Sequence, residues 1–144
     1  MALSGGGHGR LGRDRRCCVA YWCVLIAIVL PYLSTVTAKA VGGGFSPRHN
    51  HDPRALLDNL QGLGRRANNA QLNGFEITPA FAAAVIIAHL AGGAAQGVLD
   101  QLAIAFVISR VLYTLCYLAD WAILRSLVWF VGVGLIVALF VVAA

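Results

Sequence analysis

Charged side chains are scarce in this chain. Asp, Glu, Lys and Arg together make up 12% of its 144 residues, whereas roughly 25% is usual in soluble domains. Hydrophobic residues account for 59%, and their runs are too long for a soluble core of this size. The composition therefore excludes an ordinary soluble domain and predicts an all-α integral membrane protein with a single domain.

Sequence motifs of several common functional classes are also missing. The 4 cysteines show no Cys-x-x-Cys spacing, so they indicate no disulfide framework. There is no Gly-rich phosphate loop and no nucleophile elbow. His49 and His51 have no third plausible ligand beside them, so we expect no metal. The net charge of +5 comes partly from an N-terminal tail, and its arginines are not interleaved with exposed aromatics, so we expect no nucleic-acid partner.

Four apolar segments approach or exceed the roughly 20 residues that a helix needs to cross a bilayer. We expect a four-helix bundle with helices at about residues 17–40, 53–91, 94–119 and 121–142. Asp52 and Pro53 suit the N-cap and first position of the second helix. That helix is longer than one span, so its polar first half, Arg54 to Gln71, should project from the membrane or cover its surface. Only Asp120 separates the last two helices, which predicts a tight antiparallel hairpin.

The N-terminal region allows two interpretations. Residues 1–16 are rich in glycine and arginine, which predicts a disordered basic tail. The arginines, the apolar run and Ala38-Lys39-Ala40 also resemble a cleaved signal peptide. The apolar run from Cys17 to Leu33 is longer than usual for such a peptide, and Lys39 does not suit a cleavage site. We therefore favour a retained first helix.

The charges conflict over membrane orientation. Arginines in the N-terminal tail argue for a cytoplasmic N-terminus. A larger number of basic residues lie at the opposite membrane surface. If that surface faces the cytoplasm, both termini lie on the outer side of the membrane, and we favour this orientation. These basic residues are Lys39, Arg48, Arg54, Arg65, Arg66 and Arg125.

A polar stripe leads into the second apolar run. Arg66, Asn69, Asn73 and Glu76 are spaced three, four and three residues apart. They therefore fall on one side of a helix. Such groups are costly in lipid and should face a bundle interior or an aqueous cavity, which favours a functional site. The alternative is that they only hold helices together.

The third and fourth helices carry polar positions that should meet this stripe. Arg110, Tyr113 and Tyr117 share one helix face, and Arg125, with Ser126 beside it, begins the fourth helix. Antiparallel alternation brings the start of the second helix to the membrane surface that holds the short 119–121 connection. Arg110 should lie deeper. Packing tyrosines and a snorkelling Arg125 remain open as alternatives.

This set of groups suits a small zwitterionic or anionic ligand. A guanidinium presents a rigid fork for carboxylates, and a carboxylate pairs with an ammonium group. A guanidinium beside a bound thiol also favours the thiolate. Glutathione has all these features, but the residues alone do not single it out.

Three segments resemble the MAPEG family, the membrane-associated proteins in eicosanoid and glutathione metabolism. The segment Arg66–Pro79 resembles the family signature, Arg110–Tyr117 its third-helix motif, and Leu124–Ser126 its fourth-helix motif. The matches come in the right order between about Pro31 and the C-terminus. The form of the signature is most similar to that of bacterial members, which implies a multi-pass protein of the bacterial inner membrane.

The resemblance implies a homotrimer that binds glutathione, as co-substrate, between neighbouring subunits. It also implies a transferase or peroxidase that acts on hydrophobic electrophiles or lipid hydroperoxides. Arg125 would be catalytic and stabilise the thiolate. The implied glutathione-binding residues are Arg66, Asn73, Glu76, Arg110, Tyr113, Tyr117 and Ser126. The chain departs from the family at Asn69, often a basic residue, and at Trp129, often tyrosine; Tyr113 stands where histidine also occurs.

Two rival functions remain. A non-catalytic membrane protein could keep the same fold in a structural or lipid-binding role. A small transporter could use Arg110 and Glu76 as an intramembrane charge pair, but the sequence lacks inverted repeats and broken helices.

Overall fold

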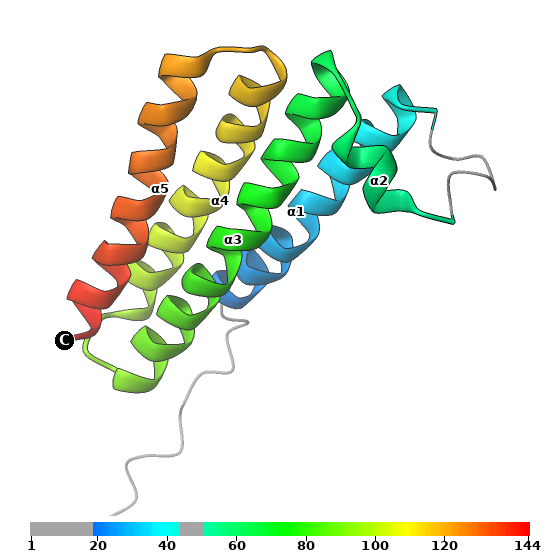
Figure 1. Ribbon diagram of the computed structural model, residues 1–144. Helices are drawn as coiled ribbons and strands as arrows, with labels where there is room; N and C mark the ends of the chain where they lie inside the picture. Colours follow the sequence, from blue (N-terminus) through cyan, green and yellow to red (C-terminus); the bar gives the residue numbers. More distant parts are fainter. Residues whose placement is uncertain (1–18, 44–50) are drawn as a thin grey trace, which may run out of the picture.

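The computed structural model describes residues 19–43 and 51–144, and its regular structure there is entirely helical. The helices are α1 (Val19–Val41), α2 (Pro53–Asp58), α3 (Gly62–Ala91), α4 (Gln96–Leu118) and α5 (Ala122–Ala143). All except α2 are long and apolar enough to cross a membrane. They lie alongside one another, and α2 sits at one end of the bundle (Figure 1). The expected multi-pass four-helix bundle is confirmed, whereas the predicted tail at residues 1–16 lies outside the described residues.

The prediction of one continuous helix over residues 53–91 is wrong, because the chain turns between α2 and α3. At this turn the Asn59 Nδ2 group donates to the Ala55 carbonyl at 2.8 Å. Asparagine side chains compete with helical backbone bonds in this way. Gly62 then has a φ of +56°, a left-handed conformation that favours glycine. The turn buries Leu60 in a small apolar cluster beside α1 and α3.

Other helix boundaries agree with the sequence signals. An Asp52 carboxylate oxygen accepts from the Ala55 N–H at 3.1 Å and caps α2, with Pro53 at the first helical position. Gly92 ends α3 with a φ of +68°. Asp120, with a φ of +64°, lies in the short connection between α4 and α5. The last two helices therefore form the expected tight hairpin.

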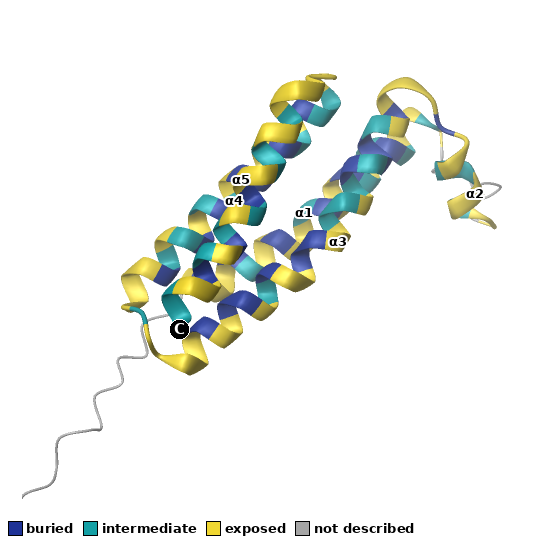
Figure 2. Cartoon of the chain, turned by 60° about the vertical axis from the view of Figure 1, so that its left-hand side comes forward, coloured by how far each residue is buried: buried dark blue, intermediate teal, exposed yellow. Residues whose placement is uncertain are grey.

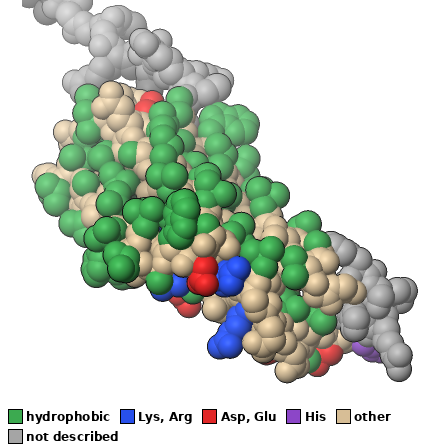
Figure 3. Space-filling model, turned by 90° about the horizontal axis from the view of Figure 1, so that it is seen from above, with side chains coloured by type: hydrophobic (Ala, Val, Ile, Leu, Met, Phe, Trp, Pro, Cys, Tyr) green, Lys and Arg blue, Asp and Glu red, His purple; other side chains and the backbone are tan. Residues whose placement is uncertain are grey.

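Small and aromatic side chains fill the centre of the bundle. The rings of Phe81 in α3 and Phe106 in α4 stack with their centroids 3.9 Å apart. Around them, small residues allow the helix backbones to approach closely. The fully buried alanines include Ala20, Ala27, Ala84, Ala88 and Ala103. Burial follows the facing sides of the helices (Figure 2). On the face seen in Figure 3, apolar side chains are far more numerous than charged ones, which suits a lipid environment.

A proline fixes α1 against α3. Pro31 has no N–H group, so the Ala27 carbonyl loses its usual helical partner. The Thr78 hydroxyl of α3 lies 3.2 Å from that carbonyl oxygen and 2.7 Å from the Gly74 carbonyl oxygen of its own helix, so its single proton is shared between the two acceptors. Gly74 permits this approach, since a Cβ there would lie 2.6 Å from the Pro31 ring. The contact holds the first half of α3, which carries the polar stripe, in a fixed position.

Candidate functional site

A groove of about 240 Å³ opens between α3, α4 and α5. Asn73 lines it from α3, and Tyr113 and Tyr117 line it from α4. The remaining lining comes from the first half of α5 and consists of Arg125, Ser126, Trp129 and Phe130. The structure thus brings together candidate residues that the sequence distributes over three helices.

Arg125 is held in the groove by an aromatic ring. Its guanidinium carbon lies 4.5 Å from the centroid of Tyr117. Such a cation–π contact fixes the charge while leaving the nitrogen donors at the edges of the guanidinium accessible. Arg125 is only half-buried, so its charge is available to a ligand in the groove.

The two phenols and Ser126 complete the polar part of the lining. The rings of Tyr113 and Tyr117 meet edge to face, with centroids 5.5 Å apart. Tyr113 is buried, and Tyr117 is half-buried. The Ser126 hydroxyl donates to the Ala122 carbonyl of its own helix at 3.1 Å. Its oxygen therefore remains as an acceptor on the groove side.

Arg110 lies behind the groove rather than in its lining. Its side chain is 4% exposed. Nη1 donates to Asn73 Oδ1 at 3.3 Å, and Nη2 donates to the Val128 carbonyl at 3.5 Å. The guanidinium carbon is 4.6 Å from the Tyr113 ring centroid and 5.7 Å from that of Phe106. In the single chain, Arg110 thus contacts residues that line the groove, while its own side chain is almost fully buried.

Arg66 also lies outside the groove. Its Nε donates to the Leu118 carbonyl at 3.3 Å, and Nη1 is 3.7 Å from an Asp120 carboxylate oxygen. A cation beside the C-terminus of α4 is favourable because that end of a helix is partially negative. Within one chain, these contacts connect α3 to the α4–α5 hairpin. For Arg66 they match the alternative in which the polar stripe only holds helices together.

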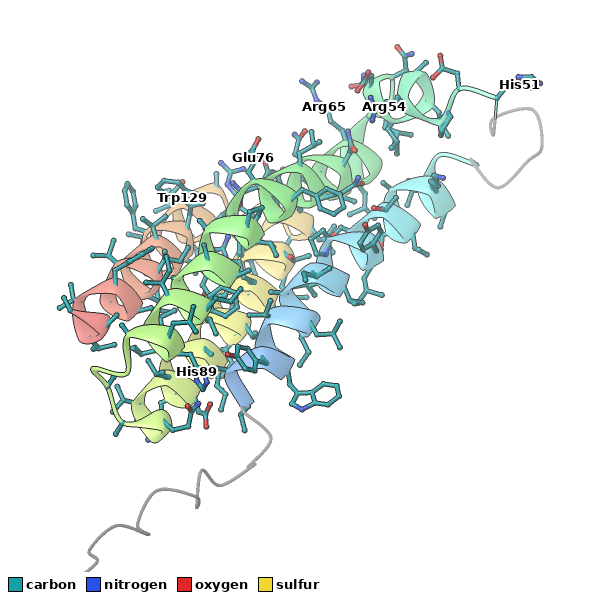
Figure 4. The ribbon with its side chains drawn as sticks, turned by 90° about the horizontal axis from the view of Figure 1, so that it is seen from below. His51, Arg54, Arg65, Glu76, His89 and Trp129 are labelled. Carbon is teal, nitrogen blue, oxygen red and sulfur yellow. The ribbon has the colours of Figure 1, made fainter. Side chains whose placement is uncertain are left out.

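Glu76 is exposed and does not line the groove. It lies on α3 on the same side of the bundle as Trp129 of α5, as Figure 4 shows. Asn69, in the same polar stripe, is half-buried. The stripe is therefore divided: Arg66 contacts the hairpin, Asn73 lines the groove, and Glu76 is exposed outside the groove lining.

Sequence reasoning missed three neighbours of the site. Trp129 and Phe130 line the groove, whereas the sequence marked Trp129 only as a departure from the family and did not indicate Phe130. Gly132 is buried directly against Arg110. A glycine within an apolar span, about two helical turns after Arg125, was the available signal.

The described part of the chain contains no group of His, Cys, Asp and Glu side chains that could hold a metal ion. The architecture and the groove define a multi-pass membrane protein with a polar site between its helices. Its sequence matches the MAPEG family over residues 19–144, nearly the whole chain, and the protein belongs to this family. Comparisons with curated proteins and with solved structures give no significant match.

Proposed function

We propose that this protein is a glutathione-dependent transferase or peroxidase that acts on hydrophobic electrophiles or lipid hydroperoxides. Membership of the MAPEG family supports a membrane function related to glutathione or eicosanoids. The observation that carries the proposal is Arg125, whose guanidinium is held over Tyr117 at a groove in a lipid-facing bundle. The proposed location is the bacterial inner membrane, because the signature segment is most similar to bacterial forms.

In this proposal, Arg125 is the catalytic residue. Its positive charge stabilises the glutathione thiolate, the form of the thiol that reacts. The thiolate then forms a thioether, either by displacing a leaving group from an electrophilic carbon or by adding to an activated double bond, which then takes up a proton. With a hydroperoxide, the thiolate attacks the terminal oxygen, the O–O bond breaks, the alcohol leaves after protonation, and glutathione becomes a sulfenic acid. In the second case a further glutathione completes the reduction, which yields glutathione disulfide and water. Ser126 and the phenols of Tyr113 and Tyr117 supply polar contacts around the ligand.

The proposed assembly is a homotrimer with glutathione between subunits. Beside the groove, α3 and α5 present exposed apolar side chains, among them Leu72, Phe75 and Phe130. Glu76 lies on this side of the bundle. In the single chain it is exposed and does not line the groove. In the assembly it would pair with the ligand's ammonium group, and Arg66, which is partly exposed, would lie beside a ligand carboxylate.

The non-catalytic alternative has one observation in its favour. Arg66 uses its donors on Leu118 and Asp120 of its own chain. At least this part of the polar stripe has a structural role without any ligand. A protein that used the whole stripe for assembly would keep the fold and lack glutathione binding.

Calorimetry of glutathione binding to the detergent-purified protein tests the proposal. We expect saturable binding that is abolished in Glu76→Ala, and no turnover in Arg125→Ala although its assembly is intact. Arg65→Ala is a matched control, because Arg65 is an exposed arginine on α3 that does not line the groove. A well-formed assembly that binds no glutathione at millimolar concentration would overturn the proposal. A Glu76→Ala variant that dissociates, with a silent Arg125→Ala variant, would favour the structural alternative.

A further inference from the structure

The buried guanidinium of Arg110 contacts the side-chain amide of Asn73, and this contact fixes which end of the amide faces the groove. Arg110 Nη1 is 3.3 Å from the side-chain oxygen of Asn73. A guanidinium has only hydrogen-bond donors, whereas a side-chain amide has one accepting oxygen and one donating NH₂ group. The oxygen of Asn73 must therefore face Arg110. Since Asn73 lines the groove, its NH₂ group remains as the group that can donate to a ligand.

The guanidinium has little freedom to move from this place. The rings of Phe106 and Tyr113 lie beside it, and Nη2 reaches the Val128 carbonyl. Among the described residues, no carboxylate is bonded to it, and its buried Nε has no hydrogen-bond partner. A charge buried in this way, without a paired carboxylate, costs stability. A buried arginine at this place is therefore explained better by the group that it positions than by a gain in stability.

Gly132 creates the space that the guanidinium occupies. A Cβ at this position would lie 2.7 Å from Arg110 Nη2 and 3.1 Å from Arg110 Cζ. Real Cβ atoms essentially never approach another atom to 2.7 Å, so any side chain here would displace the guanidinium. Gly134, on the same helix, has nothing within 4 Å of the equivalent Cβ position. The close contact at Gly132 is therefore specific to Arg110, whose guanidinium would have to shift.

We propose that Gly132 and Arg110 are positioning residues that hold the Asn73 amide with its NH₂ group toward the groove. That NH₂ group then donates to a carbonyl or carboxylate oxygen of the ligand. The inference rests on the proposed function for the identity of the ligand, glutathione, but the orientation of Asn73 is a property of the free protein. Arg110 thus acts on the ligand through Asn73.

The first test needs no ligand. The side-chain amide signal of Asn73 is recorded by NMR on detergent-solubilised protein labelled with nitrogen-15 asparagine, and it is assigned by its loss in Asn73→Ala. We expect Gly132→Ala to shift this signal and the matched Gly134→Ala to leave it in place. Arg110→Met, which removes the donor without adding volume beside α5, should shift it as well and serves if Gly132→Ala does not fold. An Asn73 signal that neither substitution moves would overturn the proposal.

The second test measures whether the effect on binding passes through Asn73. We expect Gly132→Ala to weaken glutathione binding about tenfold, the effect of losing one hydrogen bond to the ligand, while Gly134→Ala binds normally. In an Asn73→Ala background, Gly132→Ala should cause no further loss, because residues that act as one unit are not additive. Losses that multiply would contradict the proposal, since they indicate independent structural damage.

The two proposals fail in different ways. If the unaltered protein binds no glutathione, the proposed function fails, and the NMR comparison still decides whether Arg110 and Gly132 orient Asn73. If glutathione binds but the Asn73 signal ignores both substitutions, the proposed function stands and the positioning role fails.

Discussion

Arg110 and Arg125 lie on the two helices of one hairpin, and their surroundings differ sharply. Arg110 is buried among Phe106, Tyr113 and Asn73, with its Nη donors directed to groups of its own chain. Arg125 is half-buried over the face of Tyr117 and lines the groove. One arginine is thus enclosed behind the site, and the other faces it.

This difference shows that residue type does not decide the role of a charge in a membrane bundle. Both arginines are costly in lipid and therefore indicate function. Burial and hydrogen-bond partners then separate a group that can meet a ligand from one that can only orient a neighbour. We therefore expect different effects from substitutions at Arg125, at Arg110 and at the contacts that hold the helices around them.

The largest expected effect is at Arg125. Arg125→Ala should lower kcat for glutathione conjugation at least 100-fold, the scale of losing a group that stabilises developing negative charge, which is roughly 100- to 1,000-fold. The melting temperature and the assembly should stay unchanged, since the side chain is only half-buried. Steady-state kinetics with a hydrophobic electrophile, together with size-exclusion chromatography, measure both quantities. An Arg125→Ala variant with a lowered melting temperature and an unchanged kcat would show that Arg125 supports the fold and is not catalytic.

Arg110→Met should separate binding from stability. Replacing a buried charge that has no carboxylate partner among the described residues by an apolar side chain is often neutral or stabilising. We therefore expect an unchanged or higher melting temperature, with glutathione affinity lowered about tenfold through Asn73. Thermal unfolding in detergent and calorimetry check the two parts. A large loss of stability with unchanged affinity would assign Arg110 to the core alone.

The contact between Thr78 and the α1 backbone near Pro31 should affect stability. Thr78→Val removes a hydroxyl that is shared between the Gly74 carbonyl of its own helix and the Ala27 carbonyl of α1. The buried Ala27 acceptor is then left unpaired, which costs about 1–3 kcal/mol. Thr37→Val is the control, since the Thr37 hydroxyl donates only to the Leu33 carbonyl of its own helix at an exposed position. Unfolding measurements in detergent should separate the two variants, and equal stabilities would contradict the role of Thr78.

The smallest effect is expected at the hairpin. The Arg66–Asp120 ion pair joins a side chain that is 31% exposed to one that is 73% exposed. Pairs of this kind contribute about 0–1 kcal/mol and weaken with salt. Asp120→Asn should therefore change the melting temperature only slightly, and the change should disappear at high salt. Asparagine also tolerates the positive φ at this position. A large loss that persists at high salt would show that this pair supports the fold.

Much of the fold follows from local sequence signals. The apolar runs predict the membrane spans, Asp52-Pro53 predicts the start of α2, and Gly92 predicts the end of α3. The turn after Asp58 was missed, because apolar Leu56, Leu57 and Leu60 continue the helical pattern through it. Its cause is a side-chain bond from Asn59 and the burial of Leu60 against α1, and the second of these depends on the tertiary structure.

The site was predictable to a lesser degree. The level shared by Asn73, Tyr117 and Arg125 follows from antiparallel topology, and the groove contains all three. The burial of Arg110 could not be read from its spacing, because helical periodicity gives the face of a residue but not what covers it. Gly132 stayed unnoticed for the same reason, since only the packing of α4 on α5 reveals that a guanidinium lies against it.

The most direct test of the central claim is the ultraviolet absorbance of the glutathione thiolate in the bound state at neutral pH. We predict that thiolate absorbance rises when glutathione binds the unaltered protein. The rise should be absent in Arg125→Gln, which keeps a polar side chain but removes the charge. A bound glutathione that stays protonated, or a thiolate signal that persists in Arg125→Gln, would contradict the role assigned to Arg125.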